Sequence, residues 1–217
     1  MRIDESTLKR GRIRQKHMEM ILSSLSPHPR PKLKYETYTL DSKSASYVLS
    51  IAGHRYDDVT EKRVIDLGCG IGVLAIGAAL IGAKYTVGVD IDRDSIQVAK
   101  ENASKLGVDV NYVTGDIEAI HHSFDTALMN PPFGSWSRGA DVKFLKKALD
   151  ISTITYSLHK RTPTNRDFLK NQISSFGKIV DRIFELEISL PRTFTFHKKK
   201  KYLVEVDLYR IKSLKGR

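Results

Sequence analysis

The stretch Arg63-Val-Ile-Asp-Leu-Gly-Cys-Gly-Ile-Gly72 decides how the rest of this 217-residue chain is interpreted. Val64 and Ile65 are typical of the end of a buried strand, and the three glycines at alternate positions let the backbone turn sharply and pass close to a ligand. The apolar run from Val73 to Leu80 follows and predicts a helix. The pattern therefore indicates a cofactor loop that opens a β-α-β unit.

The spacing within this loop favours one class of cofactor. The dinucleotide fingerprint leaves two residues between its second and third glycines and binds a pyrophosphate. Here a single residue separates Gly68 from Gly70 and Gly70 from Gly72, and Asp66 stands two positions before the first glycine. A carboxylate there would repel a pyrophosphate but would suit a ligand that carries an ammonium and a sulfonium. We therefore expect S-adenosyl-L-methionine, bound in part by Asp66, Gly68 and Gly70.

Two further acids follow predicted strands. The strand Tyr85 to Asp90 ends in Asp90, twenty residues after the loop, where a carboxylate can accept hydrogen bonds from both ribose hydroxyls of the cofactor. The strand Asp109 to Thr114 leads to Asp116, which can accept a hydrogen bond from the adenine amino group. The alternatives are an ordinary acid at a strand end for Asp90 and a loop-capping residue for Asp116.

Composition indicates a single globular domain outside the membrane. The hydrophobic content is 41%, no apolar run is long enough to span a bilayer, and the N-terminus lacks an apolar signal core, so we expect a soluble, cytoplasmic protein. The single cysteine, Cys69, lies inside the loop, which excludes an intrachain disulfide framework. The seven histidines show no metal-ligand spacing, and we predict no metal site.

The charge of the chain favours a nucleic-acid partner. The net charge is +11 and the sequence pI is about 9.6. Basic residues gather in Lys198 to Lys201 and near the start of the chain, where RNA-binding candidates are Arg10, Arg12 and Arg14. The alternative is that the charge serves solubility alone.

Residues 1–32 form a predicted basic extension to a methyltransferase domain over residues 33–217. A helix is expected within Lys9 to Leu25, before the prolines from Pro27 to Pro31. It can act as an arm on RNA or as a helix packed on the sheet.

The second informative stretch is the apolar strand from Phe124 that runs into Asn130-Pro-Pro-Phe133. Two successive prolines stiffen the backbone, so that the carbonyl of Pro131 and the side-chain carbonyl of Asn130 can grip the two hydrogens of an exocyclic amine. Phe133 offers a flat face on which a base can stack. These groups would act by orientation and electrostatics. The alternative is a proline turn that ends a strand.

The remaining elements complete an α/β sheet. Helices are expected over Ser42 to Ala52, around Leu145 and over Thr164 to Phe176, and a fifth strand over Thr153 to Leu158. Two long strands, Lys178 to Ser189 and Tyr202 to Ile211, follow without a helix between them. Their connection mixes aromatic and cationic residues, a combination suited to RNA, and adds these RNA-binding candidates: Phe196, His197, Lys198, Lys199, Lys200 and Lys201.

Taken together, five segments resemble the methyltransferase-like protein five family and its archaeal relatives: Asp66-Leu-Gly-Cys-Gly70, Asp90-Ile-Asp92, Asn130-Pro-Pro-Phe-Gly134, Tyr156-Ser-Leu-His-Lys160 and Phe196-His-Lys-Lys-Lys200. The resemblance covers residues 31–211. It implies a Rossmann-like class I S-adenosylmethionine-dependent methyltransferase, with a seven-stranded, mostly parallel sheet and a C-terminal antiparallel strand. It also implies N6-methylation of one adenosine in small-subunit ribosomal RNA.

The same resemblance assigns residues to the site. It implies a catalytic motif made of Asn130, Pro131, Pro132 and Phe133, with Asn130 also near the cofactor. Relatives contact the cofactor through a Glu-Gln-Tyr-Pro-Thr segment. Here Glu36 and Tyr38 match, while Thr37, Thr39 and Leu40 replace the Gln, Pro and Thr, and we expect Thr37 and Leu40 at the cofactor. The other implied cofactor residues are Gly68, Ile71, Val73, Asp90, Asp116 and Ile117.

The resemblance also implies a partner. Asp109 to Thr114 is expected at a sheet edge and contains neither proline nor lysine, so it can accept a strand from another protein. Family members use this side of the sheet to bind a small zinc-containing methyltransferase activator. An N-terminal arm that covers the edge is the alternative.

Three other functions compete with an RNA adenine-N6 methyltransferase. Asn-Pro-Pro can present a side-chain amide, so a protein glutamine N5-methyltransferase is possible, as is a DNA adenine methyltransferase. A non-catalytic RNA-binding protein is the rival from another class, and the intact Asp90 and Asn130 argue against it.

Overall fold

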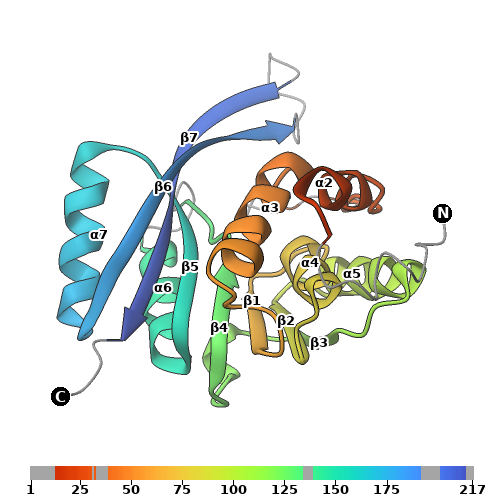
Figure 1. Cartoon of the computed structure of the whole chain (residues 1–217), viewed down its shortest axis with the longest axis horizontal. Helices are drawn as coiled ribbons and strands as arrows, with labels where there is room; N and C mark the ends of the chain where they lie inside the picture. The colour runs from red at the N-terminus through yellow and green to blue at the C-terminus, as the bar shows by residue number, and fades with distance from the viewer. Residues whose placement is uncertain (1–12, 31, 33–38, 134–138, 192–200, 214–217) are drawn as a thin grey trace.

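A seven-stranded sheet forms the centre of the protein (Figure 1). The computed structural model describes residues 13–30, 32, 39–133, 139–191 and 201–213. The strand order is β3-β2-β1-β4-β5-β7-β6; neighbours from β3 to β5 pair in parallel, and β7 is antiparallel to both β5 and β6. This arrangement confirms the predicted Rossmann-like fold. The bounds are β1 Arg63–Leu67, β2 Tyr85–Asp90, β3 Asn111–Thr114, β4 Phe124–Met129, β5 Ser152–Lys160, β6 Lys178–Pro191 and β7 Lys201–Ser213.

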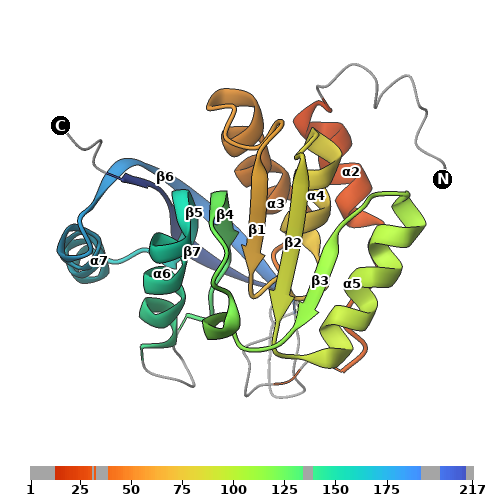
Figure 2. The ribbon, with the colours of Figure 1, turned by 90° about the horizontal axis from the view of Figure 1, so that it is seen from below.

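Helices cover both faces of the sheet (Figure 2). Because successive residues of a strand point to opposite faces, Val64 packs in the cluster that includes Leu49 and Leu74, whereas Ile65 packs with Leu145 and Leu169. The described helices are α2 Gln15–Ser23, α3 Ser42–Leu49, α4 Val73–Ile81, α5 Arg93–Leu106, α6 Ala140–Ile151 and α7 Pro163–Ser175. The first four lie on one face, and α6 and α7 lie on the other. None of the helices in the described residues could cross a membrane.

The described part of the N-terminal extension packs into the core. Met18, Ile21 and Leu22 of α2 are buried in the same cluster as residues of α3. The helix predicted within Lys9 to Leu25 is found from Gln15, where Arg14 precedes it in an extended conformation. Arg14 is exposed at this end of α2, and its contact with RNA stays a prediction.

Two predicted elements have different bounds in the structure. The helix expected over Ser42 to Ala52 ends as an α-helix at Leu49 and continues as a π-helical turn, Ser50–Arg55. Gly53 permits this packing, because a Cβ there would lie 2.8 Å from Ile81. The strand expected over Asp109 to Thr114 begins only at Asn111, which pairs with Val87, although β2 itself starts two residues earlier at Tyr85.

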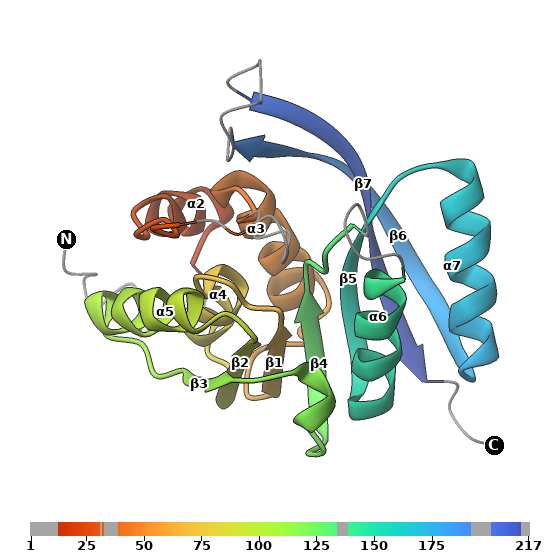
Figure 3. The ribbon, with the colours of Figure 1, turned by 180° about the vertical axis from the view of Figure 1, so that it is seen from behind.

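The hairpin of β6 and β7 extends past the parallel strands and reaches over α3 (Figures 1 and 3). Asp41 ties the two together: it accepts hydrogen bonds from the backbone N–H groups of Ser44, at 3.0 Å, and Ser189, at 2.9 Å. The first bond caps the N-terminus of α3 and the second fixes β6. A single carboxylate thus joins the hairpin to the start of α3.

Three polar residues of the motif Tyr156 to Lys160 are buried in the protein: Tyr156, Ser157 and His159. The Tyr156 hydroxyl donates to Asp58 at 2.6 Å, and the same carboxylate pairs with Arg210 of β7. His159 is buried, lies 2.7 Å from the Ser157 hydroxyl, and has a pKa lowered to about 3 by burial. Tyr156 therefore helps to hold β5 against β7 through Asp58 and Arg210, and the buried His159 is neutral.

Candidate active site

The glycine loop folds over the carboxyl end of β2. Gly68, Gly70 and Gly72 have φ angles of 72°, 53° and 87°, in the left-handed region that favours glycine. The N–H groups of Gly68 and Cys69 both donate to the carbonyl of Val89, at 2.8 and 2.9 Å. The loop is thereby fixed beside the acid that ends β2.

Asp90 is held by the loop that it faces. Its carboxylate accepts hydrogen bonds from the N–H groups of Gly70 and Asp92, each at 2.8 Å. Burial raises the pKa of Asp90, and these two donors oppose that shift. Each carboxylate oxygen retains a second acceptor direction, so Asp90 can still accept from two ribose hydroxyls.

Asp66 lies deeper, beneath the loop. It is 2% exposed and accepts a hydrogen bond from the N–H of Ala75 at 3.0 Å, in the first turn of α4. Burial raises its pKa to about 7, and the charge of Asp90 adds to this shift. A positively charged ligand beside it would offset the cost of the buried charge.

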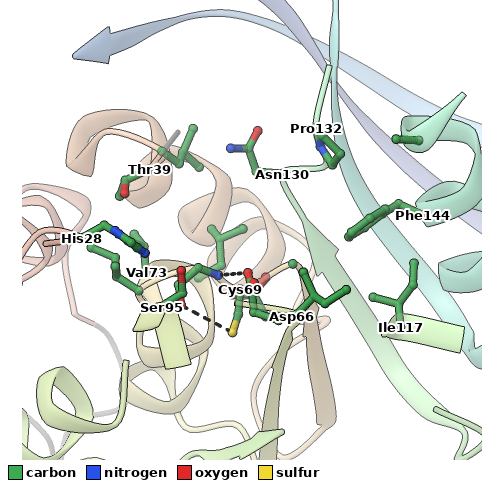
Figure 4. Close-up of a pocket in the computed structure, with 18 of the residues that line it drawn as sticks. His28, Thr39, Asp66, Cys69, Val73, Ser95, Ile117, Asn130, Pro132 and Phe144 are labelled. Atoms are coloured by element: carbon green, nitrogen blue, oxygen red, sulfur yellow. Dashed lines mark hydrogen bonds between the residues drawn. The ribbon is translucent and has the colours of Figure 1, made fainter. Parts of the chain in front are cut away.

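A cavity of about 290 Å³ opens above these acids (Figure 4). Its volume is near the lower end of the usual range for small-molecule sites. Nearly all of the predicted cofactor residues line it, most of them at or just after the ends of β1, β2, β3 and β4: Leu40, Asp66, Gly68, Gly70, Ile71, Val73, Asp90, Asp116, Ile117 and Asn130. Thr37 lies outside the described residues. The set fits S-adenosyl-L-methionine, with acids for its cationic and hydroxyl groups and apolar residues for its adenine.

Asn130 closes the cavity on the side opposite Asp66 (Figure 4). It follows the last residue of β4, and its Oδ1 atom is buried without a hydrogen-bond partner in the described structure. Pro132 also lines the cavity, Pro131 is buried beside it, and Phe133 is half-buried against the core. Asn130 thus brings to the wall of the cavity a side chain whose acceptor has no partner in the described structure.

Sequence reasoning missed several lining residues, among them His28, Thr39, Ser95, Lys143 and Phe144. Thr39 was noted only as a departure from the family segment. The others come from elements far from the glycine loop in sequence, and no local pattern marks them. Only the docking of these elements brings them to the cavity.

His28 illustrates this docking. The backbone N–H of Arg30 donates to its Nδ1, so the other ring nitrogen, Nε2, carries the hydrogen that it donates to Asp92 at 3.0 Å. Lys32 binds the same carboxylate at 2.6 Å. Hydrogen bonds to Asp92, two residues after Asp90, therefore hold the segment that follows α2 in place.

The predicted RNA-binding residues lie apart from this cavity or outside the described residues. Arg14 is at the N-terminus of α2, and Lys201 is the first residue of β7. The residues for which the structure gives no placement are Arg10, Arg12, Phe196, His197, Lys198, Lys199 and Lys200.

Comparison with known proteins identifies the family. The model of the methyltransferase small domain matches residues 39–151. The uncharacterized protein MJ0284 of Methanocaldococcus jannaschii is 42% identical over 214 residues, covering 93% of this chain and 95% of that protein. The rRNA N(6)-adenosine-methyltransferase METTL5 of Danio rerio is 36% identical over 202 residues, with 90% and 97% covered.

Comparison with solved structures agrees with this family assignment. The crystal structure of PH1948 from Pyrococcus horikoshii superposes with a TM-score of 0.87 at 35% identity, covering 94% of this chain and 99% of that one. These matches extend over nearly the whole length of both proteins. The chain therefore belongs to the methyltransferase family that includes METTL5.

Proposed function

We propose that this protein transfers the methyl group of S-adenosyl-L-methionine to the N6 atom of an adenosine in small-subunit ribosomal RNA. S-adenosyl-L-methionine is the cofactor of its family. The observation that carries the choice of acceptor concerns Asn130, which lines the cofactor cavity and whose buried Oδ1 has no hydrogen-bond partner in the described structure. A buried acceptor without a donor costs free energy, and an amino group of the substrate would supply that donor.

The adenine amino group needs this help because its lone pair is delocalised into the ring. Acceptors at Asn130 and at the carbonyl of Pro131 would draw both hydrogens to one side and turn the lone pair toward the methyl sulfonium. The bound cofactor would supply the methyl group: a nitrogen–carbon bond would form as the sulfur–carbon bond breaks, and the nitrogen would lose one proton to water. The carboxamide orients the nitrogen and takes no proton itself.

RNA is the favoured substrate class for two reasons. The relative from Danio rerio is named as an rRNA methyltransferase, and the chain carries a net charge of +11. The basic stretch Lys198 to Lys201 connects β6 to β7, the hairpin that Asp41 ties to α3. Because Leu40, which precedes Asp41, lines the cavity, RNA held by this hairpin would lie near the site. A cytoplasmic location would accompany this substrate.

The substrate class can be tested with isotopically labelled cofactor and separate pools of small-subunit rRNA, large-subunit rRNA, transfer RNA, DNA and protein. We expect label in N6-methyladenosine from small-subunit rRNA. Label in methylglutamine or in DNA would favour the rival enzymes, and binding of RNA without any transfer would favour a non-catalytic protein.

We also propose that the open edge of β3 binds a small zinc-containing activator protein. β3 pairs only with β2 in the described sheet, and Val113 on it is 40% exposed. The N–H of Gly115 donates to the carbonyl of Asp90, so by alternation the N–H of Thr114 points away from β2. A strand from a partner could pair with that outer edge.

Thr114→Pro removes the outward N–H, and Thr114→Val keeps it. We expect only the proline variant to lose the activator in co-purification, with cofactor binding retained. Tyr112 is the other residue of β3 at which a proline could be placed, but its side chain packs against the glycine loop. The packing is so close that a Cβ on Gly72 would lie 2.5 Å from the Tyr112 hydroxyl, so a change there would disturb the cofactor site as well. Equal retention of the partner by both Thr114 variants would contradict the proposal.

A further inference from the structure

Lys143 stands where the adenine end of the cofactor is expected. It lies on α6, lines the same cavity as Asp116, and places its ammonium 3.1 Å from both carboxylate oxygens of that residue. The two side chains are 47% and 49% exposed. The cavity therefore contains a donor and an acceptor side by side.

Asp116 does not need Lys143 to hold its position. The carboxylate accepts a hydrogen bond from the N–H of Glu118 at 3.0 Å, which caps the 3-10 turn Ile117–Ala119. This backbone bond is the largest cause of the lowered pKa of Asp116, and Lys143 comes second. Removal of the lysine should leave the carboxylate ionised and in place.

The packing of α6 does not need Lys143 either. One turn further along the helix, the buried Lys147 donates to the carbonyl of Glu118 at 3.2 Å and joins α6 to the same 3-10 turn. A half-exposed ion pair contributes little to folding by comparison. The ammonium of Lys143, although paired with Asp116, can therefore act on a ligand at modest structural cost.

Adenine presents a matching edge. Its amino group is a donor, and the ring nitrogens N1 and N7 on either side of that group are acceptors. We propose that Lys143 is a further cofactor-binding residue, whose ammonium donates to one of these ring nitrogens while Asp116 accepts from the amino group. This inference depends on the cofactor and is independent of the RNA substrate.

Calorimetry without RNA tests the proposal directly. The ligands are S-adenosylhomocysteine and its 1-deaza and 7-deaza analogues, in which one ring nitrogen is replaced by carbon. The proteins are the wild type, Lys143→Met, and the control Lys146→Met, which removes the same charge from an exposed position of α6 outside the cavity.

We expect Lys143→Met to weaken the binding of S-adenosylhomocysteine about three- to tenfold, as for the loss of one partly exposed charged hydrogen bond. One deaza analogue should bind the wild type more weakly than the parent ligand by a similar factor, and this difference should disappear in Lys143→Met. Lys146→Met should resemble the wild type, and the melting temperatures should agree.

Two results would overturn the proposal. Equal weakening of all three ligands by Lys143→Met would mean that the lysine only positions Asp116. Unchanged affinity would mean that it has no role at the adenine. Wild-type protein that binds none of the three ligands would contradict the cofactor assignment itself, whereas failure to methylate RNA would leave this binding result intact.

Discussion

Asp66 is a buried acid whose charge the surrounding protein disfavours. Its pKa of about 7 lies above the ordinary value of 3.8, so the folded state favours the protonated form. The stabilisation from this proton is present in full below about pH 4 and is lost as the pH rises toward 7. At neutral pH the ionised carboxylate therefore lowers the stability of the cofactor-free protein, but it is available to bind a cationic ligand.

Asp66→Asn should remove the cost in stability of this buried charge. The variant keeps a side-chain acceptor for the Ala75 N–H but carries no charge. Relative to the wild type, its free energy of unfolding should increase between pH 4 and 7, by roughly 1 to 4 kcal/mol at pH 8. Urea unfolding across this range measures it, and a difference that does not vary with pH would contradict the assignment. Affinity for S-adenosyl-L-methionine should fall.

Asn130→Ala should separate chemistry from cofactor binding. Because its proposed role is toward the substrate amine, transfer should fall by about a hundredfold or more. Cofactor affinity should stay close to that of the wild type, and thermal stability should not decrease, since a buried acceptor without a partner is removed. Full turnover by the variant would disprove the mechanism.

Asp90 and Asn130 could be predicted from sequence because both directly follow or end apolar strands, and parallel strands bring their carboxyl ends to one edge of a sheet. His28 and Lys143 could not be predicted in this way. Each reaches the cavity only because a helix or segment far along the chain docks on a strand end. Such docking depends on tertiary packing and leaves no periodic pattern.

At the scale of elements, Asp41 joins the start of α3 to the β6–β7 hairpin. Asp41→Ala removes the acceptor of the Ser44 and Ser189 N–H groups and should lower the free energy of unfolding by about 1 to 3 kcal/mol. Asp41→Asn, which keeps one acceptor, should cost less. Equal stability of all three proteins would show that the hairpin is held by other contacts.

The connection between β6 and β7 should govern electrostatic binding of RNA. Neutralising Lys198 to Lys201 should weaken RNA binding and reduce its dependence on salt, by about one unit of the logarithmic slope for each lost phosphate contact. The control neutralises four exposed lysines outside the cavity: Lys62, Lys84, Lys146 and Lys170. An unchanged slope would mean that the stretch only completes the hairpin.

Element types were predictable where periodicity was strong, as for β5, α7 and the two long C-terminal strands. Bounds were wrong where tertiary contacts decide them. β3 pairs with β2 only from Asn111 onward, and α3 changes to a π-helical turn where Gly53 packs against Ile81. Neither feature is visible in the local sequence.

At the scale of the whole molecule, the proposed site joins two halves of one sheet. Asp66 lies in β1, the glycine loop follows β1, and Asp90 ends β2, whereas Asn130 follows β4, which pairs with β1 on the other side. The hairpin of β6 and β7 lies beyond β5 and reaches over α3 (Figure 1). Cofactor, methyl acceptor and RNA backbone would thus be bound by neighbouring parts of one surface.

The central claim is that Asn130 presents the amino group of an adenosine to the methyl donor. Its most direct test is a single-turnover reaction of small-subunit rRNA with cofactor that carries a trideuterated methyl group, followed by digestion and mass spectrometry of the nucleosides. We predict N6-(trideuteromethyl)adenosine with the wild type and none with Asn130→Ala. Label on another adenine atom, or equal labelling by the two proteins, would contradict the account.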